Sequence, residues 1–246
     1  MAAPTGPPRN RLLGGLTRPA WGRLAPKLSP TALHAKQLLY RPDQPITQVY
    51  FPETTVICLM AMMPNGDTIE TATVGREGAS WISASVGAPS MPCETIVVVA
   101  GDALALPIED LDIEMQENAP FRDLLTQYSH ALLIHSMRMT VCTGLHSLHQ
   151  RCARWMLTTL DRVVRDRFAV THQLLAMLIG ASRPSVSSVI GDFQKQGLVR
   201  GERGRLIVDN RRGLRAVSCG CYGVIKRNYA QVGLHPGRAR KGSAVN

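Results

Sequence analysis

The chain of 246 residues is poor in aromatic side chains (5%) and in charged side chains (19%), and it has no long apolar run. Its longest apolar segments, such as residues 96–100, are far shorter than the roughly 20 residues of a membrane-spanning helix. The first 20 residues contain Pro and Gly and no apolar stretch typical of a signal peptide. The six cysteines are scattered, unlike those of a secreted disulfide scaffold. We therefore expect a cytoplasmic protein with free thiols and no membrane partner.

The motifs of common catalytic sites are also missing. The sequence contains no GxSxG elbow, no HExxH, no phosphate-binding Walker A loop and no GxGxxG. A Ser-His-Asp triad is compatible with the composition, but no spacing favours one. We predict that the protein is not an enzyme.

What the sequence does have is apolar material for a core and an uneven charge. Hydrophobic residues make up 45% of the chain, and the formal net charge is +10. Residues 148–246 hold 18 Lys and Arg against 5 Asp and Glu, a net charge of +13, so residues 1–147 carry −3. This asymmetry indicates a near-neutral module joined to one that binds a polyanion, either nucleic acid or an anionic membrane surface.

The periodicity predicts an α+β protein. Short segments rich in β-branched residues, separated by turns containing Pro, Gly, Asn and Asp, favour a small β-barrel or jelly roll before residue 120. The strand-like segments are 48–51, 56–60, 68–74 and 95–99. The predicted parts are a disordered tail (1–8), a β-barrel or jelly-roll domain (9–119), a long helix (120–148), a helical domain with a hairpin (149–216), and a C-terminal extension that is largely flexible at its end (217–246).

The long helix carries two apolar faces. One series steps by three and four residues, as in a heptad seam: Leu125, Tyr128, Leu132, His135, Met139, Cys142 and His146. A second series lies on another face: Ile134, Met137, Val141, Leu145 and Leu148. Because a helix with two apolar faces must pack against two partners, we expect one face to cover the chain's own domain. We expect the other face to contact a second copy of the chain. The pattern therefore predicts a homodimer.

Residues 171–199 have the spacing of a helix-turn-helix. Thr171 can cap a first helix, Gly180 suits the tight turn, and Ser182 can cap a second helix with Pro184 in its first turn. The N-terminal residues of such a second helix can enter the major groove of DNA, where Arg183 has the shape for bidentate contact with guanine. An ordinary helical hairpin of a protein core is the alternative interpretation.

The following hairpin has a basic tip, GERGR at residues 201–205. As a plain solvated turn it needs no function. Next to a helix-turn-helix it is typical of a wing, whose Arg203 and Arg205 would meet phosphates. We also attribute DNA affinity to the basic residues outside the recognition helix, namely Arg151, Arg154, Arg162, Arg165 and Arg167.

These features together resemble the Crp/Fnr family of bacterial transcription regulators. The resemblance rests on LHQRCARWMLTTLDRV (148–163), on residues 171–199 and on the wing, and more weakly on LLYRPDQPITQVYFPETTVICL (38–59) and TATVGREGASW (71–81). It covers about residues 10–225. It implies a cyclic-nucleotide-binding-like sensor barrel, a dimerisation helix, a winged helix-turn-helix, and a homodimer that binds double-stranded promoter DNA and works with RNA polymerase.

The resemblance also assigns roles to single residues. Arg183 falls on the family's principal base-reading arginine. The resemblance implies phosphate contacts for Thr171, His172, Ser182 and Ser185. Pro184 and Ser188 fall where the cAMP receptor protein has a glutamate and an arginine that read bases, so no operator sequence is transferred. The expected DNA-binding residues are Thr171, His172, Ser182, Arg183, Ser185, Ser187, Ser188, Lys195, Arg203 and Arg205.

The sensor departs from the family's known effector sites. Ser80 replaces the acidic residue that holds the ribose of cAMP, and Glu94 and Thr95 replace the Arg-Ser pair that takes its phosphate. Because a carboxylate repels a phosphate, we expect no cAMP binding of the family's usual kind. The N-terminal cysteine cluster of the family's iron–sulfur oxygen sensors is absent, since the first cysteine is Cys58. We therefore predict no cofactor, and the effector-binding residues stay unassigned.

Three further groups have a possible chemistry and a simpler alternative. His135, Cys142, His146 and His149 lie within one helical face and could hold a metal or haem, or be half-polar seam residues. Cys219 and Cys221 could form a redox or metal pair, or be small residues of a terminal turn; two thiols do not complete a tetrahedral site. The third group could line an effector pocket or form a polar turn; it comprises Glu70, Arg76 and Glu77. We favour the simpler alternative in each case and predict no metal site.

The sequence thus predicts a homodimeric, sequence-specific transcription regulator that binds a palindromic promoter site under the control of a signal at the sensor barrel. Two alternatives remain. One is a constitutive DNA-binding protein with a degenerate sensor. The other is a ligand-binding signalling module whose basic tail binds RNA or membrane.

Overall fold

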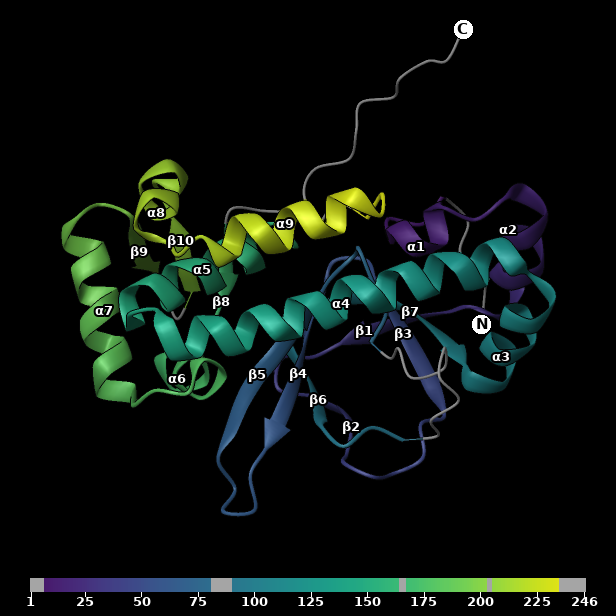
Figure 1. The fold of residues 1–246 in the computed structure, drawn as a ribbon, viewed down its shortest axis with the longest axis horizontal. Coiled ribbons are helices and arrows are strands. Elements are labelled where there is room, and N and C mark those ends of the chain that lie inside the picture. The colour runs from purple at the N-terminus through teal and green to yellow at the C-terminus, as the bar shows by residue number, and fades with distance from the viewer. Residues whose placement is uncertain (1–6, 81–89, 164–166, 203–204, 235–246) are drawn as a thin grey trace, which may run out of the picture.

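The computed structural model describes residues 7–80, 90–163, 167–202 and 205–234. Its N-terminal half is built on two antiparallel sheets, a long helix crosses the molecule, and its C-terminal half is mainly helical (Figure 1). The predicted α+β class is confirmed, and so is the order of a β-sheet domain, a long helix and a winged helix-turn-helix. Below, the β-sheet domain is called the sensor and the C-terminal half is called the DNA-binding half, after the roles predicted for them from the sequence. Most of the predicted tail, residues 1–8, and the end of the predicted C-terminal extension lie outside the described residues.

The sensor consists of two sheets in which neighbouring strands are mostly not consecutive in sequence, as in a jelly roll. The four-stranded sheet has the order β2 (Leu38–Tyr40), β6 (Glu94–Val99), β4 (Val56–Met62) and β5 (Thr68–Val74). The three-stranded sheet has the order β1 (Ser29–Leu33), β7 (Gly101–Pro107) and β3 (Gln48–Pro52). Before them come α1 (Arg11–Gly14), α2 (Arg18–Leu24) and the 3₁₀ turn η1 (Ala25–Lys27).

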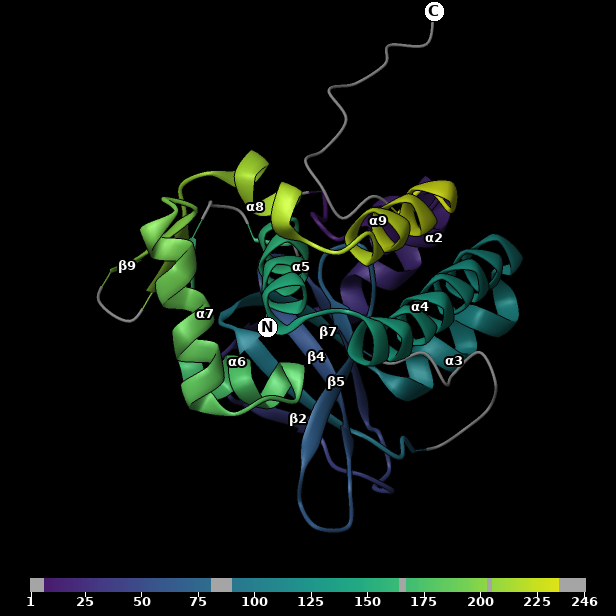
Figure 2. The same cartoon turned by 60° about the vertical axis from the view of Figure 1, so that its left-hand side comes forward.

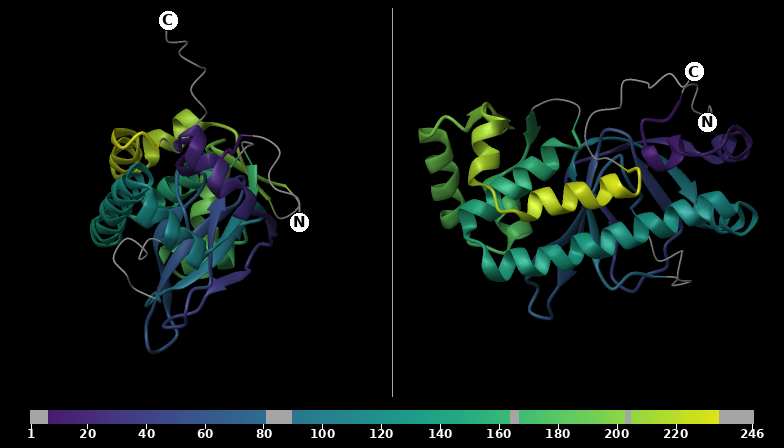
Figure 3. Two further views of the ribbon diagram at one scale, coloured as in Figure 1. Left: turned by 90° about the vertical axis from the view of Figure 1, so that its right-hand side faces the viewer. Right: turned by 45° about the horizontal axis from the view of Figure 1, so that its top comes forward.

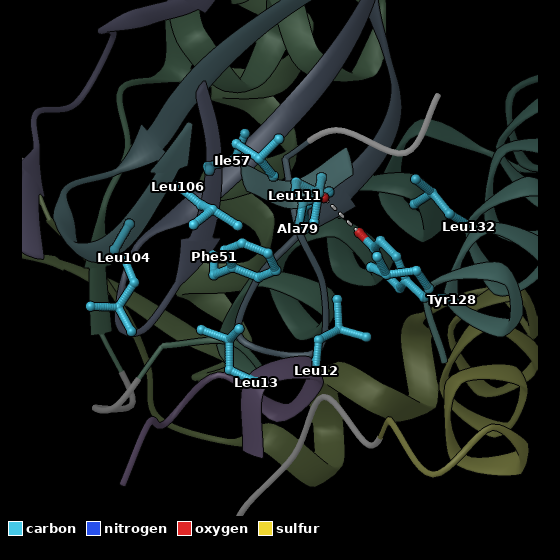
Figure 4. Close-up of a cluster of buried hydrophobic side chains, with 14 of the residues drawn as sticks. Leu12, Leu13, Phe51, Ile57, Ala79, Leu104, Leu106, Leu111, Tyr128 and Leu132 are labelled. Atoms are coloured by element: carbon cyan, nitrogen blue, oxygen red, sulfur yellow. Dashed lines mark hydrogen bonds between the residues drawn. The ribbon is translucent and has the colours of Figure 1, made fainter. Parts of the chain in front are cut away.

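The first hydrophobic core lies between these sheets, α1 and the long helix (Figure 4). Phe51 of β3 and Ile57 of β4 come from different sheets, and Leu12 of α1 joins them; all three are fully buried. Tyr128 of the long helix closes this core, and its hydroxyl donates to the carbonyl oxygen of Ala79 at 3.0 Å. The long helix is therefore an integral part of the sensor.

The second hydrophobic core explains why β4 is apolar at every position from Val56 to Met60. Successive side chains of a strand point to opposite faces, so Ile57 and Leu59 enter the first core. Val56, Cys58 and Met60 enter the second core, together with side chains from the helices of the DNA-binding half. Because both faces of the sheet are covered, the two halves of the chain share a continuous interior rather than meeting only through a linker.

The long helix α4 (Ala119–Leu145) follows α3 (Ile108–Glu117), and Asn118 caps its start by accepting from the N–H of Phe121 at 3.2 Å. It ends three residues earlier than expected. His146 is extended, and Ser147 begins a capping box with Gln150 that starts the next helix, α5 (Leu148–Leu160). The chain therefore turns sharply at residues 146–147 as it enters the DNA-binding half.

The C-terminal half contains α5, the pair α6 (His172–Ile179) and α7 (Arg183–Lys195), and α8 (Arg211–Val217). The expected hairpin is formed by β9 (Val199–Glu202) and β10 (Arg205–Val208), and a third strand, β8 (Arg167–Ala169), pairs with the other edge of β10. A turned view shows α6 and α7 on the opposite side of α5 from the long helix (Figure 2).

Residues 221–231, which lie in the predicted C-terminal extension, form a helix, α9 (Cys221–Gln231). It runs beside α4 in every view (Figures 1 and 3). Ile225 and Tyr229 are buried against the sensor core, and the side-chain amide of Asn228 donates to the carbonyl oxygen of Ala131 at 2.8 Å. The chain therefore returns to the long helix after leaving the DNA-binding half.

Among the described residues, no single helix combines the length and apolar composition needed to cross a membrane. Only the bent pair α6 and α7 meets the two criteria when its helices are taken together, by length and composition alone.

Candidate nucleic-acid interface

The helix-turn-helix is built by three local devices. The Thr171 hydroxyl accepts from the N–H of Leu174 at 3.1 Å and caps α6. Gly180 then takes a left-handed conformation, with φ 61° and ψ 56°, which a residue without Cβ adopts at little cost. The Ser182 hydroxyl caps α7 by accepting from the N–H of Ser185 at 3.3 Å. The two helices consequently cross at 109°, within the range typical of a helix-turn-helix.

The second helix, α7, is divided into a buried and an exposed face. Its apolar residues are buried in the second core: Val186, Val189, Ile190 and Phe193. The residues expected to read DNA face outward, with Arg183 at the first helical position and Ser185, Ser188 and Lys195 exposed. A free N-terminal end bearing an arginine is the geometry by which such a helix contacts base edges.

Other predicted DNA-binding residues hold the motif together. The His172 ring nitrogen Nδ1 lies 2.8 Å from the Ser187 hydroxyl, which ties α6 to α7. Ser182 and Ser185 share a hydrogen bond of 2.8 Å between their hydroxyls, although both stay exposed. Arg205 is exposed on β10, opposite Glu202 of β9, while Arg203 lies outside the described residues. The DNA contacts of these side chains remain predictions.

Some basic residues expected to supply DNA affinity are buried instead. Arg154 and Arg162 are each 1% exposed, so neither can reach a phosphate in this arrangement, and the prediction was wrong for both. Arg151 donates to the carbonyl oxygen of Ile179 at 2.9 Å and supports α6. Arg167 is exposed, and Arg165 lies outside the described residues. The periodicity of α5 did not indicate that Arg154 is buried, because this helix is buried on almost every side.

The sensor residues Glu70 and Glu77 form neither an exposed polar turn nor the lining of an open pocket. Both are buried against the DNA-binding half. Glu70 accepts from the indole N–H of Trp155 at 2.6 Å, and Glu77 accepts from Nε of Arg162 at 2.7 Å. Gly75 allows this approach, since a Cβ there would lie 2.6 Å from Cγ of Arg162. These residues therefore form a polar part of the contact between sensor and DNA-binding half, beside the second hydrophobic core.

Arg76, the third member of that group, reaches the same region. Its Nη2 donates to the carbonyl oxygen of Asp161 at 3.2 Å. The carboxylate of Asp161 in turn forms an ion pair with Arg211 at the start of α8 and accepts from the Tyr222 hydroxyl at 2.9 Å. Through Arg76, the turn after β5 of the sensor is thus linked by one polar network to the end of α5, to α8 and to α9.

At the position where the resemblance would place an effector, Ser80 is fully buried. Its hydroxyl accepts from the N–H of Tyr50 at 2.9 Å and is also hydrogen-bonded to the Tyr40 hydroxyl. Thr95 is buried and Glu94 begins β6 opposite Met60. A pocket near Ser80 is lined by other residues, among them Tyr40, Arg41, Gln44, Gln48 and Tyr50. The Ser80 hydroxyl thus makes its hydrogen bonds with protein groups, namely Tyr40 and Tyr50.

The histidines and cysteine of the proposed helical metal face separate in the structure. His135 is buried, with Nδ1 3.2 Å from the Tyr229 hydroxyl, and His149 lies on α5 with Nε2 3.2 Å from Asp192. Cys142 and His146 instead lie beside the other candidate pair, Cys219 and Cys221. Neither spacing alone could reveal this grouping, because it depends on the return of α9 to α4.

With this geometry established, the chain can be compared with known proteins. Residues 150–217 match the sequence model of the Crp-like helix-turn-helix domain. The chain carries a Crp-like helix-turn-helix domain. The resemblance drawn from the sequence is confirmed for this part, and the domain spans α5 to α8. No curated protein sequence matches the chain.

About four fifths of the chain shares the fold of solved Crp/Fnr regulators. A structure from Eubacterium rectale, described as a transcriptional regulator of the Crp/Fnr family, is 16% identical, with a TM-score of 0.64, covering 84% of this chain and 96% of that one. FixK2 from Bradyrhizobium japonicum is 14% identical, with a TM-score of 0.64 and coverage of 78% and 98%. The regulator CLP of Xanthomonas campestris, described as responsive to c-di-GMP, is 14% identical, with a TM-score of 0.56 and coverage of 78% and 99%.

Proposed function

We propose that this protein is a homodimeric, sequence-specific transcription regulator that binds a palindromic promoter site in the cytoplasm and works with RNA polymerase. The observation that carries the proposal is the Crp-like helix-turn-helix whose second helix presents Arg183 and exposed serines at its free N-terminal end. Arg183 would read a guanine, and the wing with Arg205 would position the domain on phosphates.

Homodimer formation is supported by the outer face of α4. The heptad series of α4 is the one that packs against the chain's own domain, since its members are buried or half-buried, including Leu125, Leu132 and Met139. A second apolar strip is exposed on the same helix: Leu133 (59%), Met137 (62%), Val141 (38%) and Leu145 (79%). An exposed apolar strip of this kind marks an interaction surface. A second copy of α4 would cover it and would set two recognition helices about one DNA turn, roughly 34 Å, apart.

The signal would act on the sensor, whose residue Glu70 contacts Trp155 of α5 and whose residue Glu77 contacts Arg162 just after that helix. A change in the sensor would then alter the relative orientation of the two recognition helices in the dimer. We propose no effector from the family's cAMP site, because Ser80 is bonded to Tyr40 and Tyr50 and Glu94 would oppose a phosphate.

The bonded state of Ser80 and the presence of Glu94 at the family's cAMP site also favour a second candidate. This is a constitutive DNA-binding protein whose sensor no longer binds an effector. The two differ in one measurable property. A regulated protein changes its operator affinity when small molecules from a cell extract are added, whereas a constitutive one keeps the same affinity.

The test of DNA recognition is selection of duplex sequences from a random pool by the full chain, followed by gel shifts at several salt concentrations. We expect a two-fold symmetric consensus and an affinity that falls steeply with salt. Equal binding to every duplex at all salt concentrations would refute the proposal.

A further inference from the structure

Four metal-ligating side chains from two distant segments meet where α4 ends and α9 begins. Cys142 lies in the last turn of α4 and His146 directly after it, while Cys219 and Cys221 flank the start of α9. One ligand atom from each, three Sγ and one His nitrogen, lies within 4.8 Å of all the others. Cys142, Cys219 and Cys221 are buried, and His146 is half-buried.

The distances agree with a tetrahedral site. With Zn–S bonds of about 2.3 Å and Zn–N bonds of about 2.0–2.1 Å, tetrahedral ligand atoms lie roughly 3.4–3.8 Å apart. The Sγ atoms of Cys142 and Cys219 are 3.5 Å apart, and Sγ of Cys221 is 3.8 Å from Nδ1 of His146. All three thiols are free, so none of them is used in a disulfide. Small side-chain adjustments would bring the remaining pairs into the same range.

The surrounding charge is also suited to a metal–thiolate complex. The guanidinium of Arg154 is buried, and its Nε and Nη1 have no hydrogen-bond partner among the described residues. Because three thiolates and one Zn²⁺ carry a net charge of −1, such a complex would supply the anion that this buried cation lacks. The positive end of α9, an 11-residue helix that begins at Cys221, would stabilise the same charge.

Because cysteine binds zinc as a thiolate, metal binding at these residues must displace thiol protons, and zinc affinity should rise with pH.

We propose that Cys142, His146, Cys219 and Cys221 bind one Zn²⁺ ion per chain. Three thiolates and one imidazole form a closed set that leaves no open coordination position, which is typical of structural zinc rather than of a catalytic ion. Two of the ligands precede residues 150–217, the Crp-like domain, and two follow it. One ion would therefore link the segments before and after the DNA-binding domain to each other at the end of α4.

The first experiment measures metal in the full chain, purified without air and with a reductant from cells supplied with zinc. We expect about one zinc per chain by elemental analysis, and X-ray absorption at the zinc edge should report three sulfur ligands and one nitrogen. Co²⁺ in place of Zn²⁺ should give the intense visible bands of a tetrahedral thiolate site. Protein without zinc that also fails to bind Co²⁺, or zinc surrounded only by nitrogen and oxygen, would overturn the proposal.

The second experiment uses variants with matched controls. Cys219→Ser and His146→Gln should each weaken zinc affinity at least tenfold, measured by competition with a chromophoric chelator. Cys93→Ser changes a cysteine of the sensor, and His149→Gln changes the nearest histidine in sequence; both should retain wild-type affinity. Equal zinc binding by all four variants would refute the site. If Cys219→Ser fails to fold, the ligand set reported by X-ray absorption on the unaltered chain still decides the question.

A third measurement separates metal binding from a disulfide. Mass spectrometry of alkylated, air-free protein should show Cys142 and Cys219 as thiols that become reactive only after zinc is removed. A Cys142–Cys219 disulfide in metal-free native protein would contradict the proposal. None of these measurements involves DNA, so the zinc site and the proposed transcription function can fail independently.

Discussion

Arg162, just beyond α5, donates from Nε to Oε1 of Glu77 across 2.7 Å, and neither side chain is accessible to solvent. One member belongs to the Crp-like domain and the other to the sensor, so this ion pair crosses the boundary between them. A buried pair contributes little net stability when it is intact, but the loss of one partner leaves an unpaired charge in the interior.

Glu77→Gln should therefore destabilise the protein strongly. We expect the free energy of unfolding to fall by about 3–5 kcal/mol, measured by urea denaturation. The double variant Glu77→Leu with Arg162→Met removes both charges and should recover most of this loss. A cost below about 1 kcal/mol for Glu77→Gln would show that the guanidinium has another anion or water available.

Arg183→Ala should weaken binding to the selected operator by about 1–3 kcal/mol and relax the preference at one base pair of each half-site. Lys195→Ala, on the same exposed helix, should weaken all sequences alike and reduce the salt dependence. Gel shifts with operator variants measure both effects. Unchanged specificity in Arg183→Ala would mean that another residue reads the bases.

Met137→Glu should disrupt the homodimer, because it places a charge in the centre of the exposed apolar strip of α4. Sedimentation equilibrium should show a monomer at concentrations where the unaltered chain is a dimer. Ile113→Glu is the matched control, since Ile113 is also exposed (46%) but lies on α3. If Met137→Glu remains dimeric, the strip is not the dimer interface.

Stability should depend on pH through His135. Burial, and then the charges of Arg162 and Arg154, lower the pKa of His135 well below its ordinary value of 6.5, and Tyr229 hydrogen-bonds its ring. The unfolded chain takes up a proton below that pH and the folded chain does not. The free energy of unfolding should therefore fall as the pH drops below about 6.5, by about 1.4 kcal/mol per pH unit for this residue.

His135→Gln should remove that component of the slope, measured by urea denaturation between pH 5 and 7. His130→Gln, an exposed histidine of the same helix, should leave the slope unchanged. Equal slopes in His135→Gln and the unaltered chain would show that His135 is protonated in the folded state.

Gly180→Ala should destabilise the helix-turn-helix by at least about 1 kcal/mol, because residue 180 has a positive φ. An added Cβ would also lie 2.7 Å from Cδ1 of Ile69 in β5. Gly191→Ala is the control, since Gly191 lies inside α7 with open space around it and should gain roughly 0.5–1 kcal/mol. Similar effects of the two changes in thermal unfolding would contradict this account.

The helix-turn-helix could be predicted because its signals are local: the caps Thr171 and Ser182, the turn glycine and the apolar face of α7 all lie within 29 residues. The long helix could be predicted for the same reason. Its end was predicted three residues too late, although the capping box of Ser147 and Gln150, which starts the next helix, is an equally local signal.

The contacts made by polar residues were harder to predict, since they depend on elements far apart in sequence. Arg154 and Arg162 are basic residues of a basic domain, yet both are buried, and Arg162 contacts Glu77 of the sensor and the ring of Tyr229 in α9. Cys142 and Cys219, 77 residues apart, meet only because α9 returns to α4. Composition showed which half is basic, but only packing showed which cations are available to DNA.

The hydrogen bond from Trp155 to Glu70 limits how this protein can change shape. The indole N–H and the Arg162 guanidinium are both buried, and each has its acceptor in the sensor. A gradual rotation of the DNA-binding domain about residues 146–147 would leave both donors without partners, at a cost of several kcal/mol. Any second arrangement must supply new acceptors for them, so a change between two arrangements would be all-or-none, between two fully packed states.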